Sequence, residues 1–88
     1  MIAYSWMQDG VVMRGTWEGD PDQALEAAIE RLGAEYDPAA DGWVYEAPES
    51  GELVILEEDE LLEAGAAVLA GAPNWYSLWC ARAGRPAN

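Results

Sequence analysis

The sequence contains no histidine and no lysine, and its basic side chains are four arginines. Without histidine, most designs for general acid–base catalysis and for zinc binding lack their usual side chain. Without clustered cations, a surface that grips phosphates is implausible, because nucleic-acid affinity depends on lysine and arginine. We therefore expect no enzyme, no cofactor, no metal site and no direct binding of nucleic acid.

Cysteine and long apolar runs are equally scarce. Cys80 is the single cysteine, so no internal disulfide can form, and we interpret it as a small buried apolar residue. The N-terminus lacks the pattern of an export signal. The longest apolar stretch, residues 64–72, is shorter than the roughly 20 residues that span a bilayer. These features predict a cytoplasmic protein that does not bind membranes.

Apolar and aromatic residues are abundant in what remains. The 88 residues are 51% hydrophobic and include five tryptophans, which is too apolar for a disordered acidic tail. A chain of this length forms one domain. We expect that domain to cover residues 1–83 and residues 84–88 to be a frayed tail.

The first half of the chain carries strong local signals. Residues 2–7 and 11–17 are rich in β-branched and aromatic side chains and flank an Asp9-Gly10 turn, which predicts a hairpin. A helix is predicted over residues 21–32, because Asp20 suits its N-cap and Gly33 its end. The acidic, proline-containing segment 34–41 is interpreted as a loop.

The second half predicts a hairpin of residues 42–47 and 52–57, then a helix over 58–70 and a last strand over 74–82. The continuous apolar run 53–56 is typical of a central strand covered on both sides. Gly65, inside the second helix, suggests close approach of a neighbouring element. The resulting order is ββαββαβ, an α+β domain with a mainly antiparallel sheet and two helices packed on one face.

The distribution of charge is more informative than the total of −13. Residues 1–17 are neutral and residues 64–88 carry +2. Residues 18–63 hold sixteen of the seventeen acids against Arg31 alone, a net charge of −15. The anionic charge therefore belongs to the middle of the chain.

Two groups of carboxylates stand out within this block. Asp22, Glu26 and Glu30, which we call the acidic row, recur every fourth residue, about 6 Å apart along one helix face. Successive phosphates of a nucleic-acid strand lie at a similar spacing of about 6–7 Å. The second group, Glu57, Glu58, Asp59 and Glu60, opens the second helix. An ordinary solvated helix face would account for the same residues, and the codon bias of a GC-rich genome would account for the absence of lysine.

Tryptophan and tyrosine supply all the aromatic side chains. In the predicted last strand, Trp75 and Trp79 share one face. They either complete the core or anchor a partner protein, because interfaces favour tryptophan.

In size, charge and α+β make-up, the chain resembles the small acidic inhibitors of bacteriophages: anti-CRISPR proteins, anti-restriction DNA mimics and the uracil-DNA glycosylase inhibitor. The resemblance implies an inhibitor in the bacterial host cytoplasm that occupies a basic nucleic-acid-binding surface, with a CRISPR effector as the leading partner. The residues expected to bind are Asp22, Glu26, Glu30, Glu57, Glu58, Asp59, Glu60, Trp75 and Trp79.

Residues 2–33 also resemble the HicB-type antitoxins, in which a hairpin precedes a helix with a pattern like Pro21-x-x-Ala24-Leu25-x-x-Ala28. This resemblance implies an alternative function, an antitoxin-like or adaptor module that binds a protein through its aromatic face. The sequence leaves the oligomeric state open.

Overall fold

The computed structural model describes residues 1–47, 51–72 and 74–83, the last four of these by their backbone alone. The described residues form two antiparallel sheets and three helices, which confirms the α+β class. The expected frayed tail, the centre of the second hairpin turn and the expected burial of Cys80 lie outside the described residues.

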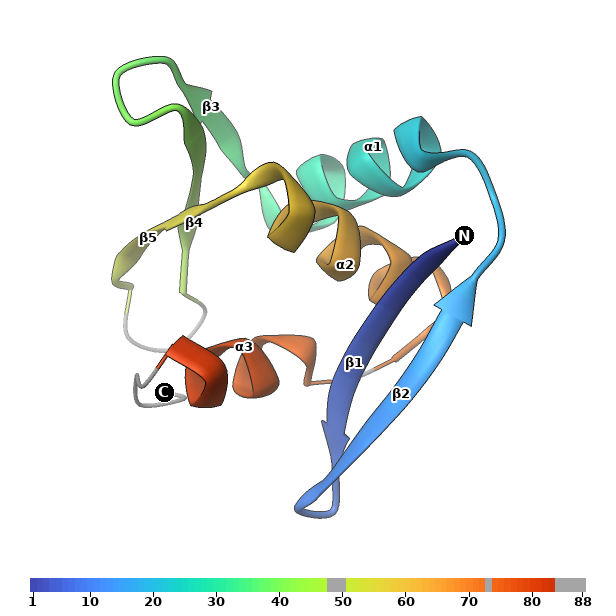
Figure 1. The fold of residues 1–88 in the computed structure, drawn as a ribbon. Coiled ribbons are helices and arrows are strands. Elements are labelled where there is room, and N and C mark those ends of the chain that lie inside the picture. Colours follow the sequence, from blue (N-terminus) through green and yellow to red (C-terminus); the bar gives the residue numbers. More distant parts are fainter. Residues whose placement is uncertain (48–50, 73, 84–88) are drawn as a thin grey trace.

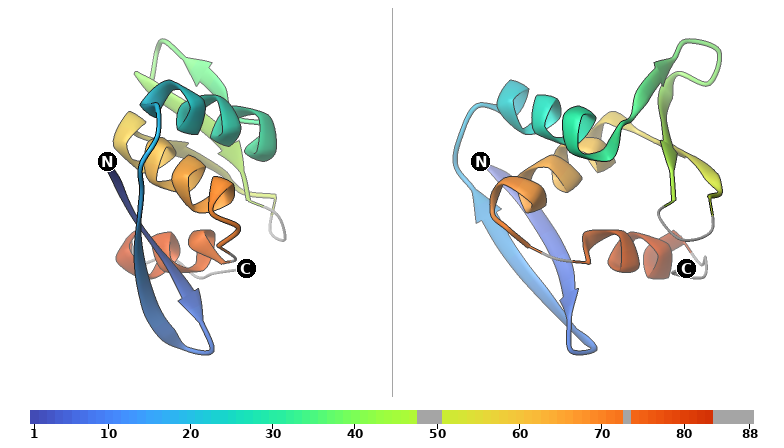
Figure 2. Two further views of the ribbon diagram at one scale, coloured as in Figure 1. Left: turned by 90° about the vertical axis from the view of Figure 1, so that its right-hand side faces the viewer. Right: turned by 180° about the vertical axis from the view of Figure 1, so that it is seen from behind.

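The helices lie between the two sheets (Figures 1 and 2). The two-stranded hairpin β1–β2 stands on one side and the three-stranded sheet β3–β4–β5 on the other. The molecule is flat, with principal extents of 32 × 30 × 17 Å. The expectation of a single sheet is therefore wrong.

Strands β1 (Ile2–Gln8) and β2 (Val11–Trp17) form the predicted first hairpin. Its turn residues, Asp9 and Gly10, have φ angles of 51° and 77°. Positive φ at both positions is what a two-residue turn needs to match the twist of its strands. The local sequence thus accounts for this element.

Helix α1 (Pro21–Leu32) has the bounds that its caps predict. The Asp20 carboxylate accepts a hydrogen bond from the Asp22 backbone N–H at 3.0 Å. Gly33 ends the helix with a φ of 65°, and its N–H donates to the Ile29 carbonyl. The polar caps satisfy backbone groups that would otherwise lack partners.

Helix α2 (Glu58–Leu69) crosses α1 at close range. A Cβ atom added to Gly65 would lie 1.8 Å from the carbonyl oxygen of Ala24 and 3.2 Å from the Cβ of Ala28. The expectation that Gly65 allows a close neighbour is therefore confirmed, and this contact holds α1 against the core.

The second sheet contains β3 (Glu35–Asp37), β4 (Gly42–Glu46) and β5 (Leu53–Leu56) in that order. The loop expected over residues 34–41 is wrong at β3, because pairing with β4 organises a segment too short to show a strand period. The central position expected for residues 53–56 is also wrong, since β5 is an edge strand in the described sheet.

The strand expected over residues 74–82 is wrong, because residues 75–82 belong to helix α3 (Trp75–Ala83). Aromatic residues favour strands locally, but Trp75, Leu78 and Trp79 also have helical spacing. Packing decides between the two, because the helix buries Leu78 and Trp79 against the core. The elements accordingly follow the order ββαβββαα in place of the expected ββαββαβ.

Candidate functional site

The acidic row lies along the exposed side of α1. Asp22, Glu26 and Glu30 are all exposed, whereas Ala24 and Ala28 on the opposite side are fully buried against α2. Within the described part of the chain, no hydrogen bond or ion pair engages the three carboxylates. The structure thus brings the three predicted residues together as a row of uncompensated negative charge on an anchored helix.

The second acidic group divides into two parts. Glu57, Glu58 and Asp59 are exposed at the start of α2, where the helix dipole favours negative charge. Glu60 is half-buried, and one of its oxygens accepts the Glu57 backbone N–H at 2.9 Å. The other accepts the indole N–H of Trp79. Glu60 therefore has a structural role that was not expected.

Trp79 lies in the core, with 8% of its surface exposed. Its ring stacks on that of Tyr76, and Trp75 packs at a centroid distance of 5.8 Å from Tyr45 on β4. The idea of an exposed Trp75–Trp79 face is thereby corrected: the helical arrangement turns both residues toward the three-stranded sheet. Trp79 is thus a core residue, while Trp75 is half-buried and packs against the core.

A surface that the sequence did not predict is the outer face of the three-stranded sheet. Pairing places Glu35 beside Val44, Val44 beside Ile55, and Glu46 beside Leu53 on that face. Leu53 is 66% exposed and Ile55 44%. We call these five residues the outer sheet face: an apolar centre with carboxylates at its rim.

The signal for the outer sheet face was the unbroken apolar run of β5. Val54 and Leu56 are buried in the core, while Leu53 and Ile55 project from the opposite side. Such a run is ordinary for a strand covered on both faces. Here one face lacks a cover among the described residues, which marks it as a candidate contact surface.

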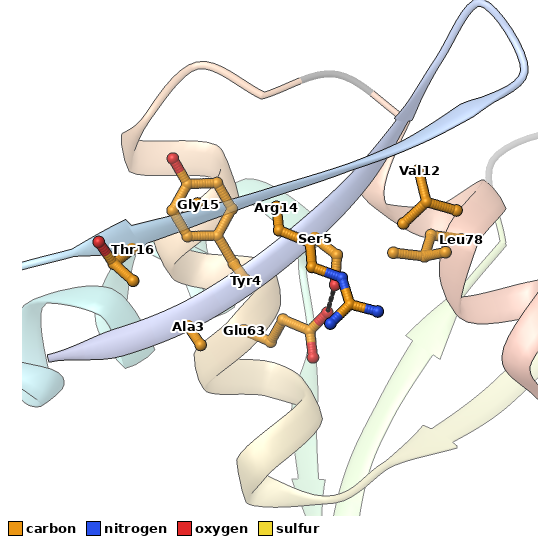
Figure 3. A pocket seen from close by; sticks show the side chains of 9 residues that line it. All are labelled: Ala3, Tyr4, Ser5, Val12, Arg14, Gly15, Thr16, Glu63 and Leu78. Atoms are coloured by element: carbon orange, nitrogen blue, oxygen red, sulfur yellow. Dashed lines mark hydrogen bonds between the residues drawn. The ribbon is translucent and has the colours of Figure 1, made fainter.

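A hollow of about 850 Å³ lies between the first hairpin and helices α2 and α3 (Figure 3). On its floor, the Ser5 hydroxyl donates to Glu63 Oε1 at 3.2 Å. Arg14 of β2 extends toward the same carboxylate (Figure 3). The hollow is open to solvent and its polar groups engage one another, an arrangement that matches no established catalytic set.

Tyr36 is the residue with a clear shift in ionisation. Its exposed hydroxyl donates to Asp41 Oδ1 at 3.1 Å, and this bond and the carboxylate charge raise the pKa of Tyr36. Both effects favour the neutral phenol. The pair ties the start of β4 to β3.

The described residues form neither a metal-binding cluster nor a membrane-spanning helix. No three of their histidine, cysteine, aspartate or glutamate side chains are placed to hold a metal ion. None of the helices that they form has the length and apolar character needed to cross a membrane. Comparison of the chain with protein-family models, curated proteins and solved structures finds no match.

Proposed function

We propose that this protein is a stoichiometric inhibitor that binds a basic, nucleic-acid-binding surface of another protein. The observation that carries the proposal is the acidic row: three exposed carboxylates, repeating about every 6 Å along a helix, without a neutralising partner in the described structure. In this role the carboxylates of α1 take the place of backbone phosphates. Glu57, Glu58 and Asp59 extend the anionic surface at α2.

The packing of α1 supports such a role. Contact of Ala24 and Ala28 with Gly65 holds the helix against α2, so the carboxylates are presented on a fixed backbone. A preorganised surface loses less conformational entropy on binding. Opposed charges would also speed association with a basic groove.

A CRISPR effector bound to its guide RNA is the first partner to test. We expect the purified chain to bind such a complex, to compete with target DNA, and to bind more weakly as NaCl is raised. Replacing Asp22, Glu26 and Glu30 together by lysine should weaken binding by about 100-fold or more. Calorimetry or surface plasmon resonance would measure the affinity, and circular dichroism would check the fold.

The matched control reverses three exposed acids outside the acidic row, Glu18→Lys, Glu35→Lys and Glu46→Lys, and changes the net charge by the same amount. Glu35 and Glu46 lie on the rim of the outer sheet face, so equal loss in both triple variants would point either to attraction by net charge or to binding through that face. An affinity that is insensitive to salt and to reversal of the acidic row would refute the proposal.

The outer sheet face favours a second candidate, an adaptor that binds one protein through apolar contacts. Leu53 and Ile55 would anchor such a partner. In that case Leu53→Ser with Ile55→Ser weakens binding, whereas reversal of the acidic row and added salt have little effect.

A further inference from the structure

The first hairpin carries no net charge, in a molecule whose anionic charge lies in residues 18–63. Residues 1–17 contain one acid, Asp9, and one arginine, Arg14. Strand β2 nevertheless exposes apolar side chains: Val11 is 58% exposed, Val12 47% and Met13 38%. Exposed apolar side chains without net charge distinguish β2 from the acidic surfaces described above.

The outer edge of β2 is open for pairing. Strand β1 lies against α2 and α3, and β2 lies on the side of β1 away from the helices (Figures 1 and 2). In the described structure this sheet contains β1 and β2 alone. A row of backbone N–H and C=O groups on an exposed edge is a template for another strand.

The turn determines which backbone N–H and C=O groups of β2 point away from β1, toward the open edge. Gln8 and Val11 flank the two-residue turn and form a hydrogen-bonded pair. Beyond them, the pairs along the two strands alternate between non-hydrogen-bonded and hydrogen-bonded. Met13, two residues beyond Val11, directs its backbone groups to β1. Val12 and Arg14 therefore direct theirs to the open edge.

The distribution of charge favours a second copy of this chain as the partner at the edge of β2. The three-stranded sheet has two edge strands, β3 and β5. Strand β5 lies between Glu52 and Glu57, and β3 contains Glu35 and Asp37, so two copies meeting at either edge would oppose like charges. At β2 two copies meet without that repulsion, while the three-stranded sheet of each lies on the far side of its helices (Figure 1). A two-fold contact also requires only that a surface complement itself.

We infer that two copies of this chain pair antiparallel through β2, which joins their hairpins into one four-stranded sheet. Such a sheet is more stable than an isolated two-stranded hairpin. The inference rests on the edge and its neutrality and does not depend on the inhibitor function.

The side chains indicate a register centred on Met13. Met13 then faces Met13 of the second copy, and each Met13 already pairs with Trp6 across its own hairpin. The result is a ladder of two tryptophans and two methionines across four strands. Arg14 faces Val12 of the second copy, which avoids two arginines directly opposite each other.

Sedimentation equilibrium of the purified chain over a range of concentrations and NaCl tests the inference. We expect a monomer–dimer equilibrium that shifts toward dimer as salt is added, because salt screens the repulsion between two molecules of charge −13. Binding to a basic partner has the opposite salt dependence. A chain that stays monomeric at every concentration and salt level overturns the inference.

Val12→Pro removes an N–H that points to the open edge and should weaken the dimer about tenfold or more. The matched control is Leu53→Pro, at the start of edge strand β5, where proline is tolerated and the dimer should persist. A dimer that survives Val12→Pro but is lost in Leu53→Pro would assign the contact to β5 instead. Circular dichroism verifies that both variants fold.

Disulfide cross-linking provides a second test that does not depend on the proline variants. In a Cys80→Ser background with oxidised glutathione as oxidant, Met13→Cys should form a covalent dimer, because a non-bonded antiparallel pair brings the two Cα atoms to about 4.5 Å. Arg14→Cys should cross-link far less. Cross-linking of Arg14→Cys in preference to Met13→Cys would overturn the register.

Discussion

At the residue scale, Gly65 is the position where the fold tolerates least change. Alanine would ordinarily stabilise a helix by about 1 kcal/mol relative to glycine. At Gly65, however, the added Cβ would lie 1.8 Å from the Ala24 carbonyl oxygen. We expect Gly65→Ala to lower the free energy of unfolding by about 3 kcal/mol or more, measured by urea denaturation.

Gly33→Ala is the control for this prediction. A Cβ added to Gly33 would meet no atom within 4 Å beyond its neighbours in the chain, but the φ of Gly33 is +65°. Only the backbone conformation is strained there, at a cost of about 1–2 kcal/mol. If Gly65→Ala were instead as stable as the parent chain, α1 and α2 would not meet as closely as described.

Tyr36 and Asp41 predict a pH dependence at the alkaline end. The bond to Asp41 raises the pKa of Tyr36 in the folded state, so the contribution to stability is present below the ordinary pKa of about 10. It is lost as pH rises through the folded-state pKa. Ultraviolet titration of tyrosinate should show Tyr36 ionising at lower pH in Asp41→Asn than in the parent chain; identical titration curves would contradict the prediction.

At the scale of the element, α1 carries repulsion that a sequence selected for stability alone would avoid. Glu26 forms like-charge i, i+4 pairs with Asp22 and with Glu30, each unfavourable by a few tenths of a kcal/mol. Glu26→Gln should raise the free energy of unfolding by about 0.5 kcal/mol while weakening binding to the proposed basic partner. Thermal denaturation and the binding assay measure the two effects.

Glu46→Gln, which removes an exposed charge from β4, is the control for Glu26→Gln in α1. It should leave affinity unchanged if α1 is the binding element. A Glu26→Gln variant that binds as well as the parent would show that the acidic row serves only solubility.

At the scale of the whole molecule, a net charge of −13 on 88 residues opposes compactness. We expect NaCl to raise the melting temperature, because it screens repulsion that the unfolded chain relieves by expanding. The triple lysine variant of the acidic row gains two charge units per replacement and so carries −7. Its melting temperature should depend less on salt; an equal dependence in both proteins would locate the repulsion elsewhere.

The acidic row and the first hairpin could be predicted because their determinants are local. Asp20, Gly33 and the Asp9-Gly10 turn act on backbone groups within a few residues, and the carboxylate spacing follows from the helix period. The outer sheet face could not be predicted in the same way. Its apolar run was visible, but whether one or both faces of β5 are covered depends on elements distant in sequence.

The sequence by itself therefore determined the charge of each segment, the bounds of α1 and the register of the first hairpin. Tertiary structure alone decided that residues 75–83 are helical and that Trp79 is buried, because aromatic side chains suit either strand or helix. The deciding contacts come from far along the chain, as with the Glu60 carboxylate that accepts the Trp79 indole N–H. Such long-range packing also left the edge of β2 open, where sequence shows only an ordinary hairpin strand.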